Sequence, residues 1–113
     1  MRNISFFLTQ KPFLDGSKTV TRRIGWTNLK VGDRLCACEK CQGLPKGGKI
    51  KRLGIIEVVD ISFEPLFDIT DDDVRLEGFQ DMSSFEFVMM FCKHMKCKPN
   101  QIVTRIEFRR INE

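Results

Sequence analysis

The stretch LGIIEVVDISF, residues 53–63, carries the strongest strand signal in the chain. Five β-branched residues fall within seven positions, namely Ile55, Ile56, Val58, Val59 and Ile61. A run this apolar predicts a strand that is buried over most of its surface. Pro65 has no backbone N–H to donate to a sheet ladder, so the strand is expected to end there.

Shorter strand and helix patterns surround this stretch. Residues 4–9, 18–24, 34–38 and 102–111 are predicted strands, because they combine β-forming residues with alternation or short apolar runs. Residues 11–16 suggest one helical turn, residues 70–77 a short helix, and the capping-box spacing from Ser83 to Glu86 opens a further helix. The helices do not alternate regularly with the strands. The expected fold is therefore α+β: a small closed or nearly closed β-barrel of five or six strands, flanked by two or three short helices.

Length and composition point to one globular domain, residues 1–113. The chain is 42% hydrophobic and 30% charged, which excludes disordered and collagenous classes. It has no apolar run near the ~18 residues that a bilayer span needs, and residues 1–10 contain no signal-peptide cleavage site. We expect a cytoplasmic protein with no membrane partner, and a monomer is favoured.

Charge is segregated along the chain. Residues 18–52 hold ten bases and two acids, whereas residues 57–87 hold ten acids and one base. A basic face would attract the phosphates of nucleic acid. Alternatively, the two segments fold against each other and cancel, or the acidic segment docks a protein partner.

The five cysteines allow two interpretations. Cys38 and Cys41 have the spacing of a zinc knuckle, and Cys92 and Cys97 could complete a tetrahedral site, with His94 as a spare ligand. Against this, Cys36 and Cys38 alternate with Ala37 in a predicted strand, and cysteines in such a pattern more often face a core. We expect no cofactor, with zinc on these four cysteines as the alternative.

The octet GSKTVTRR, residues 16–23, is the most informative one for chemistry. Lys18 could act as a base if burial lowers its pKa, and Thr21 carries a hydroxyl that could be a nucleophile. Arg22 and Arg23 could grip a phosphate or carboxylate. The alternative is a basic edge strand with solvated charges. Regular alternation places Lys18 and Thr21 on opposite faces, so they converge only if Lys18 precedes the strand proper.

Three further residues are candidates for contact with a nucleic acid. Trp26 follows the octet and could stack on a base, or else plug the core. Lys40 and Lys46 lie in or beside the glycine- and lysine-rich segment 42–51, which is expected to form a loop or hairpin tip.

The octet also carries a resemblance. Gly16, Lys18, Thr21 and Arg23 are similar to the signature of the ASCH domain family, whose members have a PUA-like β-barrel. The segments that resemble other family motifs are residues 29–33, 65–70, 77–79, 91–97 and 103–108. The similarity covers most of the chain and suggests a small phage or bacterial member.

The resemblance implies two kinds of function. The commonest family signature has a glutamate at the position of Thr21, whereas threonine resembles a bacterial subgroup that hydrolyses the amide of acetylated cytidine. In that subgroup the proposed catalytic set would correspond to Lys18, Thr21 and Glu77. Other members are treated as RNA-binding modules or nucleases. We expect a protein that binds RNA or a modified nucleotide through a basic cleft, with amidohydrolase or small ribonuclease activity as the alternative.

Overall fold

The computed structural model describes residues 1–41, 44 and 46–112. Its strands are β1 (Arg2–Ser5), β2 (Val20–Arg23), β3 (Arg34–Cys38), β4 (Arg52–Pro65) and β5 (Ile102–Ile111). Its helices are α1 (Gln10–Asp15), the 3₁₀ turn η1 (Leu66–Asp68), α2 (Asp71–Leu76) and α3 (Ser84–Met95). Across these described residues, every helix is too short or too polar to span a bilayer.

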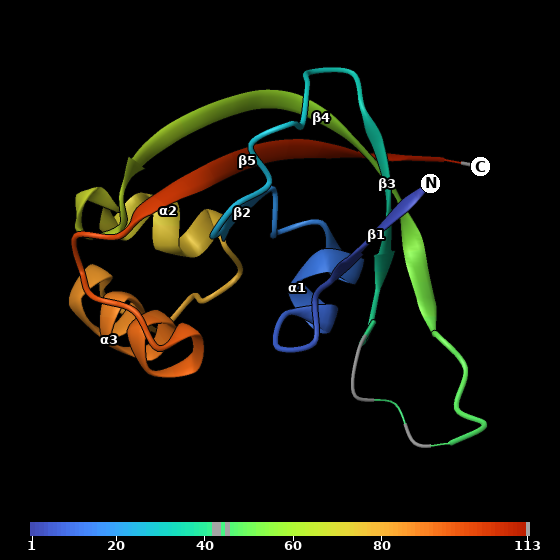
Figure 1. Cartoon of the computed structure of the whole chain (residues 1–113), viewed down its shortest axis with the longest axis horizontal. Helices are drawn as coiled ribbons and strands as arrows, with labels where there is room; N and C mark the ends of the chain where they lie inside the picture. The colour runs from blue at the N-terminus through green and yellow to red at the C-terminus, as the bar shows by residue number, and fades with distance from the viewer. Residues whose placement is uncertain (42–43, 45, 113) are drawn as a thin grey trace.

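The strands form one sheet in the order β1-β3-β4-β5-β2. β1 runs parallel to β3, and all other neighbours are antiparallel. β4 and β5 form a long central pair that arches over the helices (Figure 1). The β4–β5 register shifts between Val58 and Asp60, and a bulge of this kind bends a strand. The result is a curled half-barrel, which confirms the predicted α+β barrel class while leaving β1 and β2 as edge strands.

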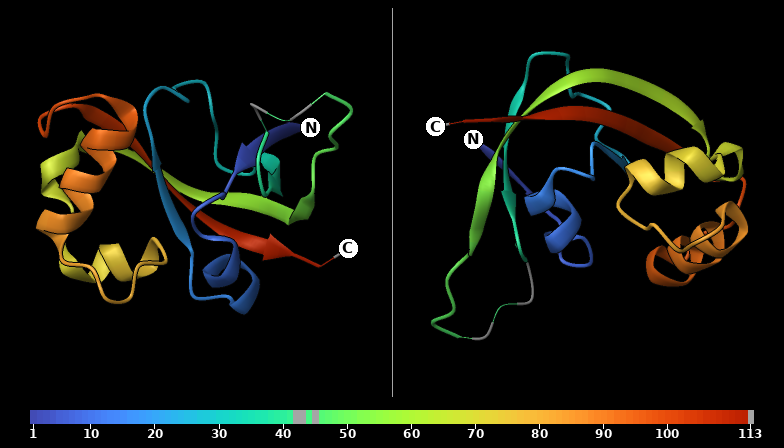
Figure 2. Two further views of the ribbon diagram at one scale, coloured as in Figure 1. Left: turned by 90° about the horizontal axis from the view of Figure 1, so that it is seen from below. Right: turned by 180° about the vertical axis from the view of Figure 1, so that it is seen from behind.

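Two large apolar clusters pack on the curled sheet, besides a small third one made by Cys36, Cys38 and Ile55. The barrel cluster contains Ile4, Phe6, Phe13, Leu35, Ala37, Leu53, Ile56, Val58, Ile106 and Phe108. The helical cluster contains Leu66, Ile69, Val74, Phe87, Val88, Phe91 and Val103. α2 and α3 lie at one end of the sheet and α1 lies beneath its middle, as the two further views show (Figure 2).

Most of the predicted elements are confirmed, with one clear difference near the N-terminus. The first strand spans Arg2–Ser5 rather than residues 4–9. The chain turns after Phe6, where Thr9 donates its N–H to the Phe6 carbonyl at 3.0 Å, and then enters α1. Phe7 and Leu8 are consequently exposed on the turn. The capping box of α3 is present as expected, from Ser83 to Glu86.

Candidate functional site

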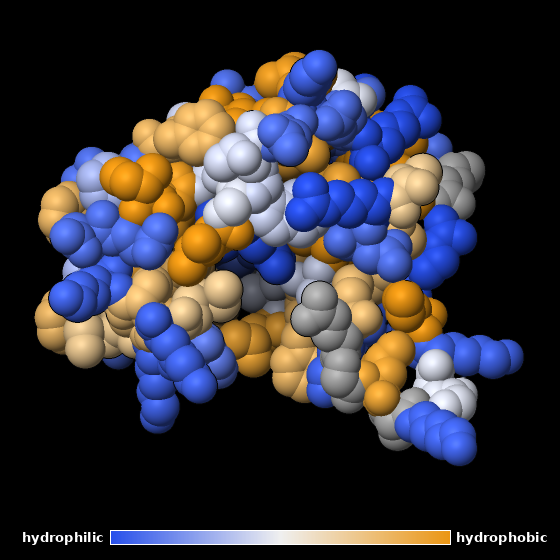
Figure 3. Space-filling view, in the orientation of Figure 1, coloured by the Kyte–Doolittle hydropathy of each residue, from blue (hydrophilic) through white to orange (hydrophobic). Residues whose placement is uncertain are grey.

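A pocket of about 230 Å³ lies between the barrel and helical clusters, because its lining includes Phe6 of the first and Phe87 and Phe91 of the second. Its walls come from the turn after β1, from β2, from the end of α2 and from α3. The space-filling view shows this face hollowed near its centre, with hydrophilic colours inside and hydrophobic ones on much of the rim (Figure 3). The polar lining includes Lys18, Thr21, Arg22, Arg23 and Glu77. The pocket therefore brings the three residues of the expected catalytic set together.

Lys18 reaches the pocket because it precedes β2. Its backbone N–H donates to the Pro12 carbonyl at 3.0 Å, and β2 begins only at Val20. The alternation of the strand therefore does not apply to Lys18, which lines the same pocket as Thr21. The sequence allowed Lys18 and Thr21 to converge only if Lys18 precedes the strand, and Lys18 does precede it.

The Lys18 ammonium is almost completely buried and fully hydrogen-bonded. Nζ donates to the Val20 carbonyl at 3.0 Å, to the Glu77 carbonyl at 2.7 Å and to Glu77 Oε1 at 3.4 Å. An ammonium has three N–H bonds, so all three have acceptors. Burial lowers the pKa of Lys18 to about 8, against the opposing attraction of Glu77. Burial thus brings the pKa of Lys18 closer to neutral pH than its ordinary value.

Glu77 forms ion pairs with both Lys18 and Arg22. It caps the C-terminus of α2 and is only 3% exposed. A negative charge is unfavourable at that end of a helix, so it needs compensation. Lys18 contacts Oε1, and Arg22 donates to Oε2 at 3.0 Å. The next residue, Gly78, has φ +106° and packs so closely on Pro12 that a Cβ would lie 2.9 Å from the proline Cβ. A side chain at position 78 would therefore clash with Pro12.

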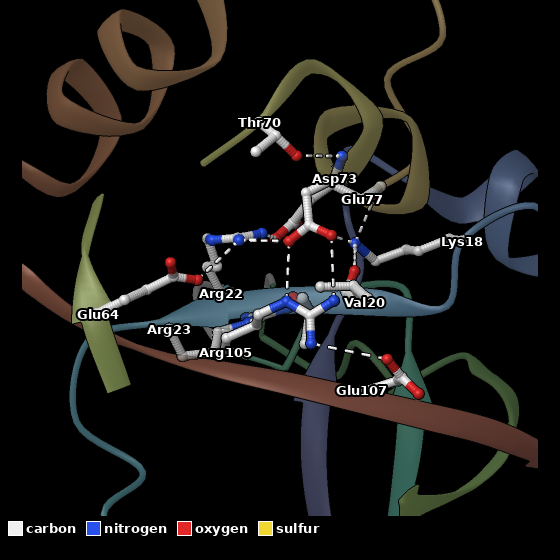
Figure 4. A network of polar contacts seen from close by, with 11 residues as sticks. Lys18, Val20, Arg22, Arg23, Glu64, Thr70, Asp73, Glu77, Arg105 and Glu107 are labelled. Carbon is white, nitrogen blue, oxygen red and sulfur yellow. Dashed lines mark hydrogen bonds and ion pairs between the residues drawn. The ribbon is translucent and has the colours of Figure 1, made fainter. Parts of the chain in front are cut away.

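Arg22 links the pocket to a larger network of ion pairs (Figure 4). Besides Glu77, its guanidinium contacts Asp73 and donates to Glu64 at 2.9 Å. Arg105 holds Asp73 through two hydrogen bonds of 2.8 and 3.0 Å. These bonds, with the contact to Arg22, lower the pKa of Asp73 to about 2.

Within this network, Arg22 is buried and paired with carboxylates of its own chain. Its side chain is 2% exposed, and both terminal nitrogens face carboxylates. Nε is buried and, among the described residues, has no hydrogen-bond partner. Arg22 lines the pocket and binds carboxylates of its own chain, and its contact with a ligand stays a prediction.

Thr21 and Arg23 form the other polar part of the lining. Arg23 donates through Nε to Thr21 Oγ1 at 3.2 Å and through Nη2 to the Ser5 carbonyl at 2.6 Å. Burial lowers the pKa of Arg23 from its ordinary value. Because Thr21 Oγ1 accepts from Arg23, its own hydrogen remains able to donate to a ligand.

The apolar walls are the part of the site that sequence reasoning missed. They comprise Phe6, Phe7, Leu8, Phe79, Phe87, Met90, Phe91 and Met95, with His94 beside them. The helical periodicity of residues 84–95 predicted an apolar face, but a periodic face does not distinguish a core from a pocket wall. Asp73, in the first turn of α2, and Arg105, in β5, are also absent from the candidate residues that the sequence singles out.

The remaining candidate residues lie outside the pocket lining. Trp26 packs on the barrel cluster, and the Arg2 guanidinium lies 3.5 Å above its ring. Lys40 is exposed, with Nζ 5.6 Å from the ring of Phe7, which lines the pocket. Lys46 is exposed in the β3–β4 connection. Trp26 thus resembles a barrel lid more than a free stacking platform.

The cysteines lie in two places. Cys38 is buried with Cys36 and Ile55, and Cys41 packs against that group. Cys92 and Cys97 pack on the helical cluster. Within residues 1–41, 44 and 46–112, no three histidine, cysteine or acidic side chains are grouped so as to hold a metal ion. The expectation of no cofactor and its alternative, zinc on Cys38, Cys41, Cys92 and Cys97, both stay predictions, which metal analysis of the purified protein would test.

Comparisons with known proteins address the fold. No family model and no curated protein matches the sequence. A crystal structure of an ASCH domain from Lactobacillus crispatus superimposes with a TM-score of 0.61 at 17% identity, covering 91% of this chain and 70% of that one. A protein from Enterococcus faecalis described by family model DUF984 superimposes with a TM-score of 0.64 at 16% identity, covering 90% and 69%. The chain therefore has an ASCH-like fold, as the resemblance of its sequence implied.

Proposed function

We propose that the pocket binds a single nucleobase or modified nucleoside, either free or within RNA. The observation that carries the proposal is the combination of aromatic walls with a polar end made by Lys18, Thr21, Arg23 and Glu77. A base has flat apolar faces that stack on aromatic side chains and an edge that exchanges hydrogen bonds. The pocket offers both kinds of contact within one cavity.

The size of the pocket favours a small ligand. Its volume of about 230 Å³ is below the roughly 300–1,000 Å³ of clefts that hold drug-sized molecules. An oligonucleotide would therefore place one base inside and keep its backbone outside. Exposed lysines of the β3–β4 connection, Lys40, Lys46, Lys49 and Lys51, supply positive charge for that backbone.

Amide hydrolysis is the second candidate, because Lys18, Thr21 and Glu77 line one pocket. Neutral Lys18 would take the hydroxyl proton of Thr21 as the oxygen attacks an amide carbonyl. In the present arrangement the Lys18 ammonium faces Glu77 and the Val20 carbonyl. Hydrolysis thus requires Lys18 to lose a proton and turn toward Thr21, whereas binding requires neither change. Binding is the proposal that the geometry supports better.

The test compares Thr21→Val with Thr27→Val, which makes the same change at an exposed site outside the pocket lining. Binding of a fluorescent oligoribonucleotide and of free nucleosides, acetylated cytidine included, is measured for each folded variant. We expect Thr21→Val to lose at least tenfold in affinity for the preferred ligand and Thr27→Val to keep it. Equal affinity in both variants would overturn the assignment of the pocket. Release of acetate by wild type and Thr27→Val that is lost in Thr21→Val would instead favour hydrolysis.

A further inference from the structure

A pair of thiols lies at the C-terminal end of α3. Cys97 Sγ is 4.0 Å from Cys92 Sγ, and the Cys97 N–H donates to the Cys92 carbonyl at 3.2 Å. Lys96 adopts the left-handed conformation, with φ 53° and ψ 48°, which turns the chain back over the helix end. A disulfide needs its sulfurs about 2.05 Å apart. The two sulfurs must therefore approach by about 2 Å, and we expect rotation of the two side chains to supply this.

A second thiol pair in the chain shows why this one is chemically different. Cys36 and Cys38 have their sulfurs 3.8 Å apart, but they are 6% and 0% exposed. They also lie two residues apart on β3, where extended geometry separates the Cα atoms by roughly 6.6 Å, near the upper limit for a disulfide. Cys92, in the last turn of α3, and Cys97, just beyond the helix, are both partly exposed. An external oxidant can therefore reach the α3 pair, whereas packing shields the β3 pair.

We propose that Cys92 and Cys97 form a reversible thiol–disulfide exchange site whose co-substrate is a small-molecule disulfide. One protein thiolate attacks the external disulfide, forms a mixed disulfide and releases one small thiol. The second protein thiolate then attacks the protein sulfur of that mixed disulfide and releases the second small thiol. Overall, two protein thiols are oxidised to one disulfide, and the external disulfide is reduced to two thiols, which take up the two protons.

The location ties this chemistry to the pocket. The bridge would enclose residues 93–96, and within that segment His94 and Met95 line the pocket. Oxidation would thus fix the position of one lip of the pocket. This consequence rests on the proposed function, but the exchange chemistry does not.

The experiment treats the native protein with oxidised glutathione, quenches free thiols by alkylation and maps peptides by mass spectrometry. We expect a peptide linked through Cys92 and Cys97 that reverts on adding a reduced thiol. Cys97→Ser should instead retain one glutathione on Cys92, and Cys36→Ala should behave as wild type. Because burial and the hydrogen bond to Cys92 raise the pKa of Cys97, the bridge should form faster as pH rises.

Three outcomes would overturn the proposal: no linked peptide in wild type, glutathione retained there without ring closure, or a bridge involving Cys36, Cys38 or Cys41. The mass readout is independent of any ligand. A bridge that forms while RNA and nucleoside binding are absent would therefore leave the exchange site standing and reject the proposed function alone.

Discussion

Two regions of this molecule concentrate charge in opposite ways. Around β2 and α2, cations and carboxylates are buried together, and the Lys18–Glu77 pair is at most 4% exposed. In the β3–β4 connection, lysines such as Lys46 and Lys49 are exposed. Buried charges must be paired to be tolerated, whereas exposed charges are solvated and contribute little to stability. The first region should therefore govern folding and the shape of the pocket, and the second the attraction of a polyanion.

This difference bears on the two interpretations of the charge segregation along the sequence. The charge segregation allowed either a basic binding face or mutual cancellation of the two segments. Cancellation occurs where Arg22 of the basic segment meets Glu64, Asp73 and Glu77 of the acidic one. The described lysines of the β3–β4 connection remain exposed, so a basic binding face is still possible there.

The largest expected effect comes from removing the shared carboxylate. Glu77→Ala leaves Lys18 and Arg22 without their common partner in a buried site. Breaking a buried ion pair from one side costs about 3–5 kcal/mol. Urea denaturation should show that loss in the free energy of unfolding, while Lys49→Ala in the β3–β4 connection should leave it almost unchanged. Similar losses in the two variants would mean that the two regions do not differ as described.

The next effect separates close packing from backbone strain. Gly78 and Gly47 both have positive φ, +106° and +82°, but a Cβ at Gly78 meets Pro12 at 2.9 Å, whereas nothing lies within 4 Å of one at Gly47. Both alanine variants incur left-handed strain, on the order of 1 kcal/mol. Only Gly78→Ala adds a clash, so its thermal midpoint should fall further than that of Gly47→Ala. It should also weaken ligand binding, because the clash displaces Glu77. Equal shifts of the midpoint would show that Pro12 yields freely.

A smaller effect appears as a pH dependence. The pKa of Lys18 is about 8 in the folded protein and 10.5 in a model peptide. Between these values the unfolded chain binds more protons than the folded one, so stability rises with pH as Lys18 deprotonates in the fold. Below about pH 8 both states are protonated and this contribution is constant. Comparing the free energy of unfolding from pH 7.5 to 10 in wild type and Lys18→Met isolates it, since the variant should lose the upward slope. A slope that persists in the variant would assign the titration to another group.

The sequence determined more of the fold than of the site. β3 and β5 lie where their patterns predict them, and the capping box begins α3 as expected, because these signals are local. The first strand was displaced because the apolar residues Phe7 and Leu8, which favour a strand, are exposed on a turn. In the site, the octet indicated Lys18 and Thr21. The partners Asp73 and Arg105 follow only from tertiary pairing between segments 32 residues apart, which no local pattern reveals.

Removing exposed lysines of the β3–β4 connection should have the smallest effect on stability but the largest effect on the salt dependence of RNA binding. Changing Lys46 and Lys49 together to glutamine removes two exposed cations from the β3–β4 connection and leaves the buried network intact. Each lost contact with a single-stranded phosphate lowers the slope of log K against log salt by about 0.7. Titrating an oligoribonucleotide at several salt concentrations should therefore give a shallower slope for the double variant, with an unchanged thermal midpoint. A control variant carries Lys93→Gln and Lys98→Gln, which remove two exposed lysines from the end of α3 and the residues that follow it. It tests whether the location of the lost lysines affects the slope. If both pairs reduce the slope equally, RNA contacts the basic surface without preference for the β3–β4 connection. If only the first pair does, the backbone of the ligand follows that connection away from the pocket.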